Sequence, residues 1–292
     1  MGNRVASERD VDQETGRAAR PATDGVATAE PVRGSDARAS RFTEVFADAR
    51  PPRARGREVA VEAPVAVEVN GIGYAVMMAT PVDLEDFALG FALGEGLVGG
   101  LADVADTLVH ETPLGWIVRL TLRAEPGSRV LDRVRRRVTE SGCGLCGLES
   151  LEALARPLPR VAAPLALDRA AIFRSLDELE RHQALGRRTG AVHAALLCAP
   201  DGAVRLARED VGRHNALDKL VGAALRKGVA LETTFALLTS RCSFELVEKA
   251  VVAGLGALVT LSAPTTLALD RAAAAGLPLT VLARKDSALA SG

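Results

Sequence analysis

The C-terminal part of the chain alternates short β-rich apolar runs with amphipathic runs of helical spacing. Short apolar runs are typical of buried strands, and a helix between successive strands gives right-handed βαβ units and a largely parallel sheet. The pattern therefore predicts an α/β fold for residues 165–292. The predicted order is strand Phe235–Leu238, helix Phe244–Ala253, strand Ala257–Leu261, helix Thr265–Ala275 and strand Leu279–Leu282.

The same domain is expected to begin with a helix, two strands and a second helix. Asp201 and Gly202 form the turn signal between the two strands. The predicted elements are helix Leu167–Leu185, strand Ala191–Leu197, strand Ala203–Ala207 and a helix from Val211 to about Arg226.

The N-terminal half has hairpin signals instead. Asn70 and Gly71 separate two β-rich runs, Val65–Val69 and Ile72–Met78, and glycine tolerates the positive φ of a two-residue hairpin turn. A helix is expected to open at Thr80 and Pro81, followed by a second hairpin. The predicted division is a disordered tail (1–45), a small α+β domain (46–140) and a Gly/Cys loop with linker (141–164).

Composition excludes several classes of protein. The 292 residues are 48% hydrophobic and 25% charged, as in a globular protein, and a net charge of −1 draws the chain neither to nucleic acid nor to an anionic membrane. No apolar run reaches the roughly 18–20 residues of a membrane helix. The polar N-terminus has no secretory signal, so a cytoplasmic location is expected.

The chain has four cysteines, and two of them, Cys143 and Cys146, are three apart in a loop with three glycines. The glycines leave the backbone open to a sulfur donor or a metal centre, and arginines just upstream favour the thiolate. Three interpretations remain open: a tight turn without chemistry, half of a zinc site, or a redox or persulfide site. No second CxxC or HxxxH motif supplies further zinc ligands, so the thiol site is favoured.

A second motif is the charged run from Arg208 to Lys219, at a strand-to-helix junction. Asp210 is predicted to cap the helix, and Arg213 and His214 project from its first turn, where a helix N-terminus binds anions. The alternative is a solvated cap in which Glu209 and Asp210 pair with the arginines. The spacing alone does not separate these two interpretations.

The ends of the predicted parallel strands form a third group. Ligands of open α/β sheets bind beyond the carboxyl ends of the strands. Here these ends carry Thr239–Arg241, Ser262–Thr266 and the basic pair Arg284 and Lys285, which together favour a nucleotide or phosphate pocket. Ordinary helix capping by Ser and Thr explains the hydroxyl groups. It does not explain the basic residues at two of the strand ends, Arg241 and the pair Arg284 and Lys285.

His193 stands where a zinc nucleoside deaminase has the His of an H-x-E motif. Ala195 replaces the Glu, and the stretch around Cys242 has a single Cys where two are needed. The missing Glu and the missing second Cys therefore argue against deaminase activity. His193 alone is as compatible with a structural role as with ligand contact.

Seven segments together resemble the FdhD family of formate dehydrogenase accessory sulfurtransferases. The similarity runs in order over roughly residues 60–284. The matching segments are 70–81, 87–96, Gly142–Gly147, Thr189–Ala195, Glu209–Lys219, Ser240–Glu245 and Ser262–Ala268.

This resemblance implies a fold, an activity and a site. It implies a cytidine-deaminase-like, three-layer C-terminal domain without the deaminase zinc or any structural metal. It also implies that Cys143, with Cys146 as its partner, accepts persulfide sulfur from a cysteine desulfurase. The sulfur then passes to the bis-guanine-dinucleotide form of the molybdenum cofactor that formate dehydrogenase needs. The resemblance implies the formate dehydrogenase apoprotein as a second partner. It also implies a homodimer. The cofactor pocket includes Leu282, Ala283, Arg284, Lys285, Asp286 and Ser287, joined by His193, Arg213, His214, Arg241 and Ser262.

Two other functions compete with sulfur transfer. One is a chaperone that delivers molybdenum cofactor without touching sulfur, and the other is a thiol–disulfide oxidoreductase. Neither Cys198 nor Cys242 is assigned a role.

Overall fold

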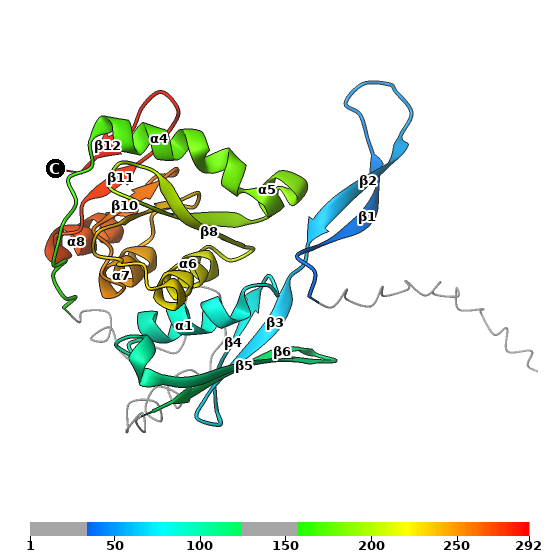
Figure 1. Ribbon diagram of the computed structural model, residues 1–292. Coiled ribbons are helices and arrows are strands. Elements are labelled where there is room, and N and C mark those ends of the chain that lie inside the picture. Colours follow the sequence, from blue (N-terminus) through cyan, green and yellow to red (C-terminus); the bar gives the residue numbers. More distant parts are fainter. Residues whose placement is uncertain (1–33, 124–156, 292) are drawn as a thin grey trace, which may run out of the picture. The chain divides into compact units, whose positions relative to one another are not determined.

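The computed structural model describes residues 34–123 and 157–291, which contain three β-sheets (Figure 1). One has two strands, one has four and one has six. Cys143, Cys146 and most of the predicted 141–164 linker lie outside the described residues.

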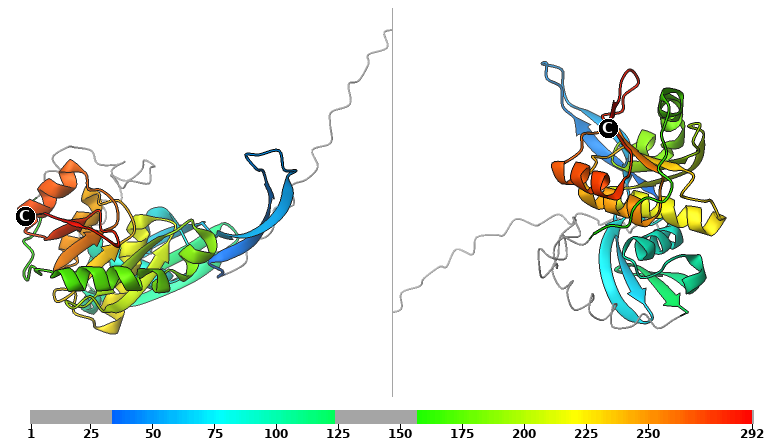
Figure 2. Two further views of the ribbon diagram at one scale, coloured as in Figure 1. Left: turned by 90° about the horizontal axis from the view of Figure 1, so that it is seen from above. Right: turned by 90° about the vertical axis from the view of Figure 1, so that its left-hand side faces the viewer.

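The two-stranded sheet is a ribbon made by strands β1 (Ala37–Glu44) and β2 (Arg53–Ala60), separate from the other sheets in Figures 1 and 2. The prediction of a disordered tail to residue 45 is therefore wrong for β1. The strand has no apolar period to reveal it, because most of its side chains are exposed and the antiparallel backbone pairing with β2 defines it.

The four-stranded sheet has the order β4-β3-β6-β5, and helix α1 (Leu84–Gly94) packs against it. Both predicted hairpins are confirmed. Asn70 and Gly71 have φ values of 49° and 79°, as a turn of this kind requires. A short 3₁₀ helix, η1 (Leu101–Asp103), precedes the second hairpin. The strands are β3 (Ala63–Val69), β4 (Ile72–Ala79), β5 (Val104–Thr112) and β6 (Gly115–Leu122).

The six-stranded sheet has the order β12-β11-β10-β9-β7-β8. Its strands are β7 (His193–Cys198), β8 (Val204–Asp210), β9 (Phe235–Leu238), β10 (Ala257–Thr260), β11 (Leu279–Val281) and β12 (Leu289–Ala290). The prediction of a largely parallel sheet is only partly right. Strands β9, β10 and β11 are parallel, but β7 runs antiparallel to both of its neighbours and β12 runs antiparallel to β11.

Helices cover both faces of this sheet (Figure 1). The predicted helix Leu167–Leu185 is interrupted: α4 (Arg169–Leu179) is followed by the 3₁₀ helix η2 (Glu180–His182) and by α5 (Ala184–Thr189). Helix α4 packs on one face. The other face packs against α6 (Arg213–Lys227), α7 (Phe244–Val252) and α8 (Thr266–Ala275). The layers agree with an α/β fold, and the deaminase-like arrangement stays a prediction.

One hydrophobic core joins the four-stranded and six-stranded sheets. It contains residues of α1 and β3 together with residues of α6, α7 and β10, all within one compact unit, Val32–Gly292. Of the two predicted domains, residues 46–140 therefore contain the four-stranded sheet and residues 165–292 the six-stranded sheet. The two sheets share one core.

Helices α1 and α6 approach closely through two glycines. A Cβ atom on Gly90 would lie 1.8 Å from the carbonyl oxygen of Asp218, and one on Gly222 would lie 1.8 Å from that of Asp86. The Asp86 side chain is buried in this interface and binds two arginines, Arg208 at 2.6 Å and Arg226 at 2.8 Å. Backbone contact and a shared carboxylate therefore fix the two helices together.

No helix in the described part of the chain combines the length and apolar character needed to cross a bilayer.

Candidate functional site

The candidate site lies at the edge of the six-stranded sheet where β8, β9, β10 and β11 end. Because β7 runs antiparallel to β8 and β9, its first residue, His193, lies at this edge too, opposite Asp210 in the strand register. The structure therefore brings His193 and the Arg208–Lys219 motif to one edge, although they are separated in sequence. It is the edge at which α/β sheets bind ligands.

Asp210 does not cap helix α6 as predicted. The helix begins at Arg213 after Gly212, without a side-chain cap. The Asp210 carboxylate instead accepts hydrogen bonds from the backbone N–H groups of Thr80 (3.0 Å) and Gly212 (2.7 Å), and lies 2.6 Å from Lys219 Nζ. Both side chains of the ion pair are fully buried, and burial lowers the pKa of Lys219, against the opposing effect of Asp210.

The rest of this network joins the two larger sheets. Lys219 Nζ donates to the Thr80 carbonyl oxygen at 2.8 Å, and Asn215 Nδ2 donates to the Met78 carbonyl oxygen at 2.8 Å. Half of the motif is thus structural. Glu209 does not pair with an arginine of the described ranges either: it accepts hydrogen bonds from the backbone of α5, at Leu185 and Gly186.

Two other residues of the same motif, Arg213 and His214, differ from the hydrogen-bonded residues Asp210, Asn215 and Lys219. Arg213 Nε and His214 Nε2 are buried atoms without a hydrogen-bond partner in the described part of the chain, and so are Ser243 Oγ and Glu245 Oε2. All four side chains come from the starts of α6 and α7, at the same sheet edge. Buried polar atoms are normally paired, so four unpaired ones in one region indicate a place for a polar ligand.

Within this cluster, the side chains of His214 and Glu245 do not hydrogen-bond to each other. His214 Nε2 lies 4.0 Å from Glu245 Oε2, which is too long for a hydrogen bond. The sequence motif Ser240–Glu245 contained both Ser243 and Glu245, but neither was singled out as a site residue. Their position after the β9 strand end was the available signal.

Burial and neighbouring charges favour the neutral form of both histidines at this sheet edge, His193 and His214. Burial lowers the pKa of His214 to about 3, and the charges of Arg213 and Lys249 act in the same direction. Burial also lowers the pKa of His193, with Arg213 lowering it further. The site thus holds cations, neutral imidazoles and the Glu245 carboxylate, so it offers a polar ligand both hydrogen-bond donors and acceptors.

A second group of predicted residues lies at the ends of β10 and β11. Leu282 donates its backbone N–H to the Ser262 carbonyl oxygen at 3.3 Å and has a φ of 50°, a left-handed conformation uncommon for leucine. Arg284 donates its backbone N–H to Ser287 at 2.7 Å, which closes the predicted stretch Leu282–Ser287 into a turn. The side chains of Arg284, Lys285, Asp286 and Ser287 are exposed, as is that of Arg241, while Ala283 is buried.

The two described cysteines are poor nucleophiles. Cys198 and Cys242 are both fully buried, and burial raises the pKa of the Cys198 thiol to about 12 and that of Cys242 to about 11. Nucleophilic attack requires the thiolate, which these pKa values make rare near neutral pH. The predicted site residues Cys143 and Cys146 lie outside the described residues.

Within the described ranges, no three His, Cys, Asp or Glu side chains gather as a metal site. The absence of a structural metal stays a prediction for the whole chain.

Comparisons with known proteins give matches over most of the chain. The model of the FdhD/NarQ family matches residues 60–290. The chain is 48% identical over 228 residues to the sulfur carrier protein FdhD of Variovorax paradoxus, covering 78% of this chain and 82% of that protein. It is 47% identical over 231 residues to the protein of the same name from Chromobacterium violaceum, covering 78% and 85%.

A solved structure shares the fold. It is a crystal structure from Desulfotalea psychrophila, described as that of a formate dehydrogenase accessory protein, with a TM-score of 0.66 and 24% identity. The match covers 88% of this chain and 96% of the other.

Proposed function

This chain belongs to the FdhD/NarQ family, and we propose that it carries sulfur for formate dehydrogenase. The names of its relatives support the sulfur-carrier role, and the description of the related crystal structure supports the link to formate dehydrogenase. The observation that carries the site is a cluster of four buried polar atoms at the strand ends that have no hydrogen-bond partner among the described residues.

Cys143 is the proposed sulfur-bearing residue. Of the four cysteines, Cys198 and Cys242 are buried with raised thiol pKa values, which leaves Cys143 and Cys146 as the better candidates for a reactive thiol. Their glycine-rich sequence and the arginines upstream favour an accessible, ionised thiol. The family resemblance assigns Cys143 the first role and Cys146 the second.

In the first step, the Cys143 thiolate attacks the outer sulfur of a persulfide on a cysteine desulfurase. The S–S bond of the donor breaks, the desulfurase leaves as a thiolate, and Cys143 becomes Cys143–S–SH. One thiol and one persulfide exchange places, so no external oxidant or reductant is required.

In the second step, the Cys146 thiolate attacks the inner sulfur of that persulfide. A Cys143–Cys146 disulfide forms, and the outer sulfur leaves as hydrosulfide for the molybdenum centre of the substrate. The two thiols supply the two electrons that reduce the sulfur. A dithiol reductant must then restore both thiols before another cycle.

The cofactor to be sulfurated is the bis-guanine-dinucleotide form of molybdenum cofactor, bound as a substrate at the sheet edge. Arg213, Arg241 and Arg284 are the proposed partners of its pyrophosphate groups, because guanidinium groups bind phosphate oxygens in pairs. His193, His214, Ser262 and the remaining residues of Leu282–Ser287 complete the proposed pocket. The unpaired Arg213 and His214 atoms and the exposed Arg241 and Arg284 side chains support this assignment.

The proposed partners are the cysteine desulfurase and the formate dehydrogenase apoprotein, and the proposed assembly is a homodimer in the cytoplasm. The partner and dimer assignments rest on the family resemblance.

The test is intact-mass measurement after incubation with a cysteine desulfurase and cysteine. We expect an adduct of about 32 Da, one sulfur atom, on the wild type and on Cys198→Ser, but none on Cys143→Ser. Adduct on Cys198 alone, or none on either the wild type or Cys146→Ala, contradicts the proposal. The Cys146→Ala variant should accumulate the adduct, because it lacks the second thiol.

The two alternatives give different results. A chaperone that only delivers cofactor would still activate formate dehydrogenase as Cys143→Ala, whereas a sulfur carrier would leave the enzyme metallated and inactive. A thiol–disulfide oxidoreductase would turn over dithiol substrates and hold no sulfane sulfur.

A further inference from the structure

The β1–β2 ribbon has two chemically different faces. Residues directly opposite each other in an antiparallel pair share a face, and the register pairs Phe42 with Arg55 and Glu44 with Arg53. We call this side the arginine face. It consists of Arg38, Ser40, Phe42, Glu44, Arg53, Arg55, Arg57 and Val59. The other face carries mainly alanine, glycine and threonine, with Arg41 and Glu58.

The arginine face keeps a positive charge after its internal ion pairs are formed. Glu44, its one acid, pairs with Arg53 and Arg55, so the face has a net charge of +3. Glu58, on the opposite face, and Asp36 both pair with Arg188 instead. Arg38 has no ion pair among the described residues. Arg57 donates a hydrogen bond to the Thr189 carbonyl oxygen. Exposed arginines that outnumber the acids on their own face favour an acidic partner.

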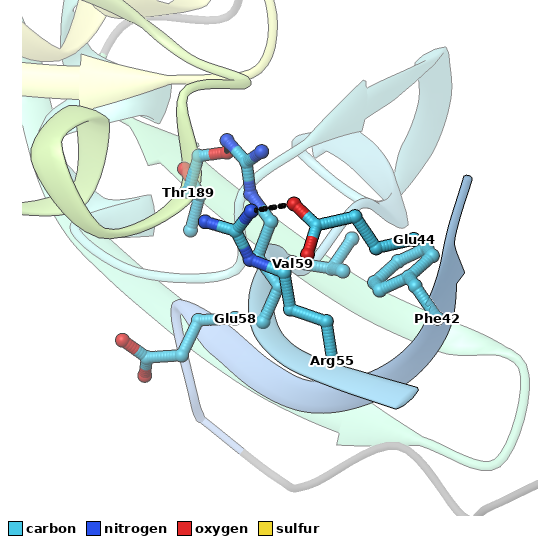
Figure 3. Close-up of a pocket in the computed structure, with 7 residues that line it drawn as sticks. Phe42, Glu44, Arg55, Glu58, Val59 and Thr189 are labelled. Atoms are coloured by element: carbon cyan, nitrogen blue, oxygen red, sulfur yellow. Dashed lines mark hydrogen bonds and ion pairs between the residues drawn. The ribbon is translucent and has the colours of Figure 1, made fainter. Parts of the chain in front are cut away.

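The same face has an apolar site. Phe42 is 49% exposed, and its ring and Val59 are the apolar part of the lining of a cavity of about 370 Å³ (Figure 3). The rest of the lining is Glu44, Arg55, Arg57, Glu58 and Thr189. Figure 3 shows Phe42, Glu44 and Arg55 on one side of the ribbon, with the Glu58 carboxylate directed away from them. The cavity is at the lower end of the roughly 300–1,000 Å³ range of ligand pockets, which suits one inserted side chain.

The ribbon also has free strand edges. In the described part of the chain, β1 and β2 pair only with each other, so each leaves one edge without a β partner. An extended peptide can add to such an edge through its main chain, and then every second side chain lies over the same face. Both strands lie almost wholly before residue 60, where the family match begins.

We propose that the β1–β2 ribbon is a docking site for an extended acidic segment of a partner protein. The segment lies along a ribbon edge, places acidic side chains over the arginine face and inserts one apolar side chain beside Phe42. A protein segment is favoured over nucleic acid because the face offers one aromatic ring rather than a series of stacking platforms. This proposal is independent of the sulfur-carrier function.

The probe is a fluorescein-labelled peptide, Ser-Glu-Thr-Glu-Thr-Leu-Thr-Glu-Ser, which places three Glu and one Leu on one side when extended. A second peptide has Ser in place of Leu. Binding to the full chain is measured by fluorescence anisotropy. We expect saturable binding, about fivefold weaker for the peptide without Leu, with that preference lost in Phe42→Ala.

Arg38→Ala and Arg41→Ala are matched variants. They remove the same charge from the same strand but on opposite faces. Arg38→Ala should weaken binding about fivefold and Arg41→Ala less than about twofold. Equal weakening by both variants means undirected charge attraction and overturns the proposal, as does the absence of saturable binding.

Two other occupants are distinguished in the same experiment. A single-stranded nonadeoxynucleotide that binds more tightly than the peptide, with the same Arg38 dependence, assigns the face to nucleic acid. Sedimentation of a dimer that Arg38→Ala or Phe42→Ala dissociates assigns it to a second copy of the chain. Either result overturns the proposal.

Discussion

His214 is the residue whose protonation the structure constrains most clearly. Burial and the neighbouring charges of Arg213 and Lys249 lower its pKa from 6.5 to about 3, and its Nε2 atom has no hydrogen-bond partner among the described residues. A neutral ring in this place is able to contact an anionic ligand without the desolvation cost of a second buried cation.

The lowered pKa has a consequence for stability. Between pH 6.5 and about 3 the unfolded chain binds a proton at His214 that the folded chain does not. The free energy of unfolding therefore falls as the pH drops through this range. We expect urea unfolding between pH 7.5 and 5 to show a steeper loss of stability for the wild type than for His214→Gln. Arg213→Gln should lie between them, because removing the neighbouring cation raises the His214 pKa. Identical pH dependence of the wild type and His214→Gln would contradict the assignment.

At the scale of elements, the contact between α1 and α6 is the most sensitive to volume. Alanine in place of glycine inside a helix normally adds about 0.5–1 kcal/mol of stability. At Gly90 and Gly222, however, the added Cβ would lie 1.8 Å from a backbone oxygen of the other helix. A backbone atom cannot move away as a flexible side chain can. The clash therefore outweighs the gain in helix stability, and the change in the free energy of unfolding is negative.

We therefore expect Gly90→Ala and Gly222→Ala each to lower the free energy of unfolding by about 1–3 kcal/mol or more. Gly73→Ala is the control, because a Cβ there meets no atom within 4 Å and the residue has no positive φ. Urea unfolding monitored by circular dichroism measures all three. A neutral or stabilising effect at both Gly90 and Gly222 would show that the helices lie further apart.

Elements with a strong local signal could be predicted from the sequence, and those defined by distant partners could not. The turn at Asn70 and Gly71 is local chemistry, and so are the apolar runs of β9 and β10. The direction of β7 depends on its neighbours across the sheet, and β1 depends on backbone pairing with β2. No periodicity in one segment carries that information.

The candidate site divides in the same way. Arg213 and His214 were correctly placed in the first turn of a helix at the sheet edge. The role of Asp210 was wrong, because its partner Lys219 and its backbone donor Thr80 meet it only in the folded chain. Ser243 and Glu245 were missed because their significance lies in buried oxygens that have no hydrogen-bond partner in the described ranges, which a sequence cannot reveal.

For the whole molecule, the shared core predicts one cooperative transition. Residues of the four-stranded and six-stranded sheets belong to the same buried cluster, and the Asp210–Lys219 pair adds hydrogen bonds to Thr80 between them. If either part unfolded alone, the faces of α1 and α6 that meet in this core would lose their cover. Single domains with one core usually unfold in an all-or-none manner.

Trp116, the only tryptophan, lies in β6 of the four-stranded sheet and reports on it selectively. We expect its fluorescence change in urea to coincide with the loss of helical circular dichroism, which comes mainly from the helices on the six-stranded sheet. A tryptophan transition at lower urea would mean that the two sheets unfold separately.

The course of α6 also determines where a spectroscopic label can be attached without disturbing the site. The helix starts at the sheet edge that holds Arg213 and His214 and ends after 15 residues at Lys227, a length of about 22 Å. The connection to β9 therefore lies at the far edge, where Glu232 and Thr233 are exposed. In a Glu232→Cys variant that also carries Cys143→Ser and Cys146→Ser, a dye joined to the new thiol would sit a helix length from the proposed pocket, within range for energy transfer to a fluorescent nucleotide bound there.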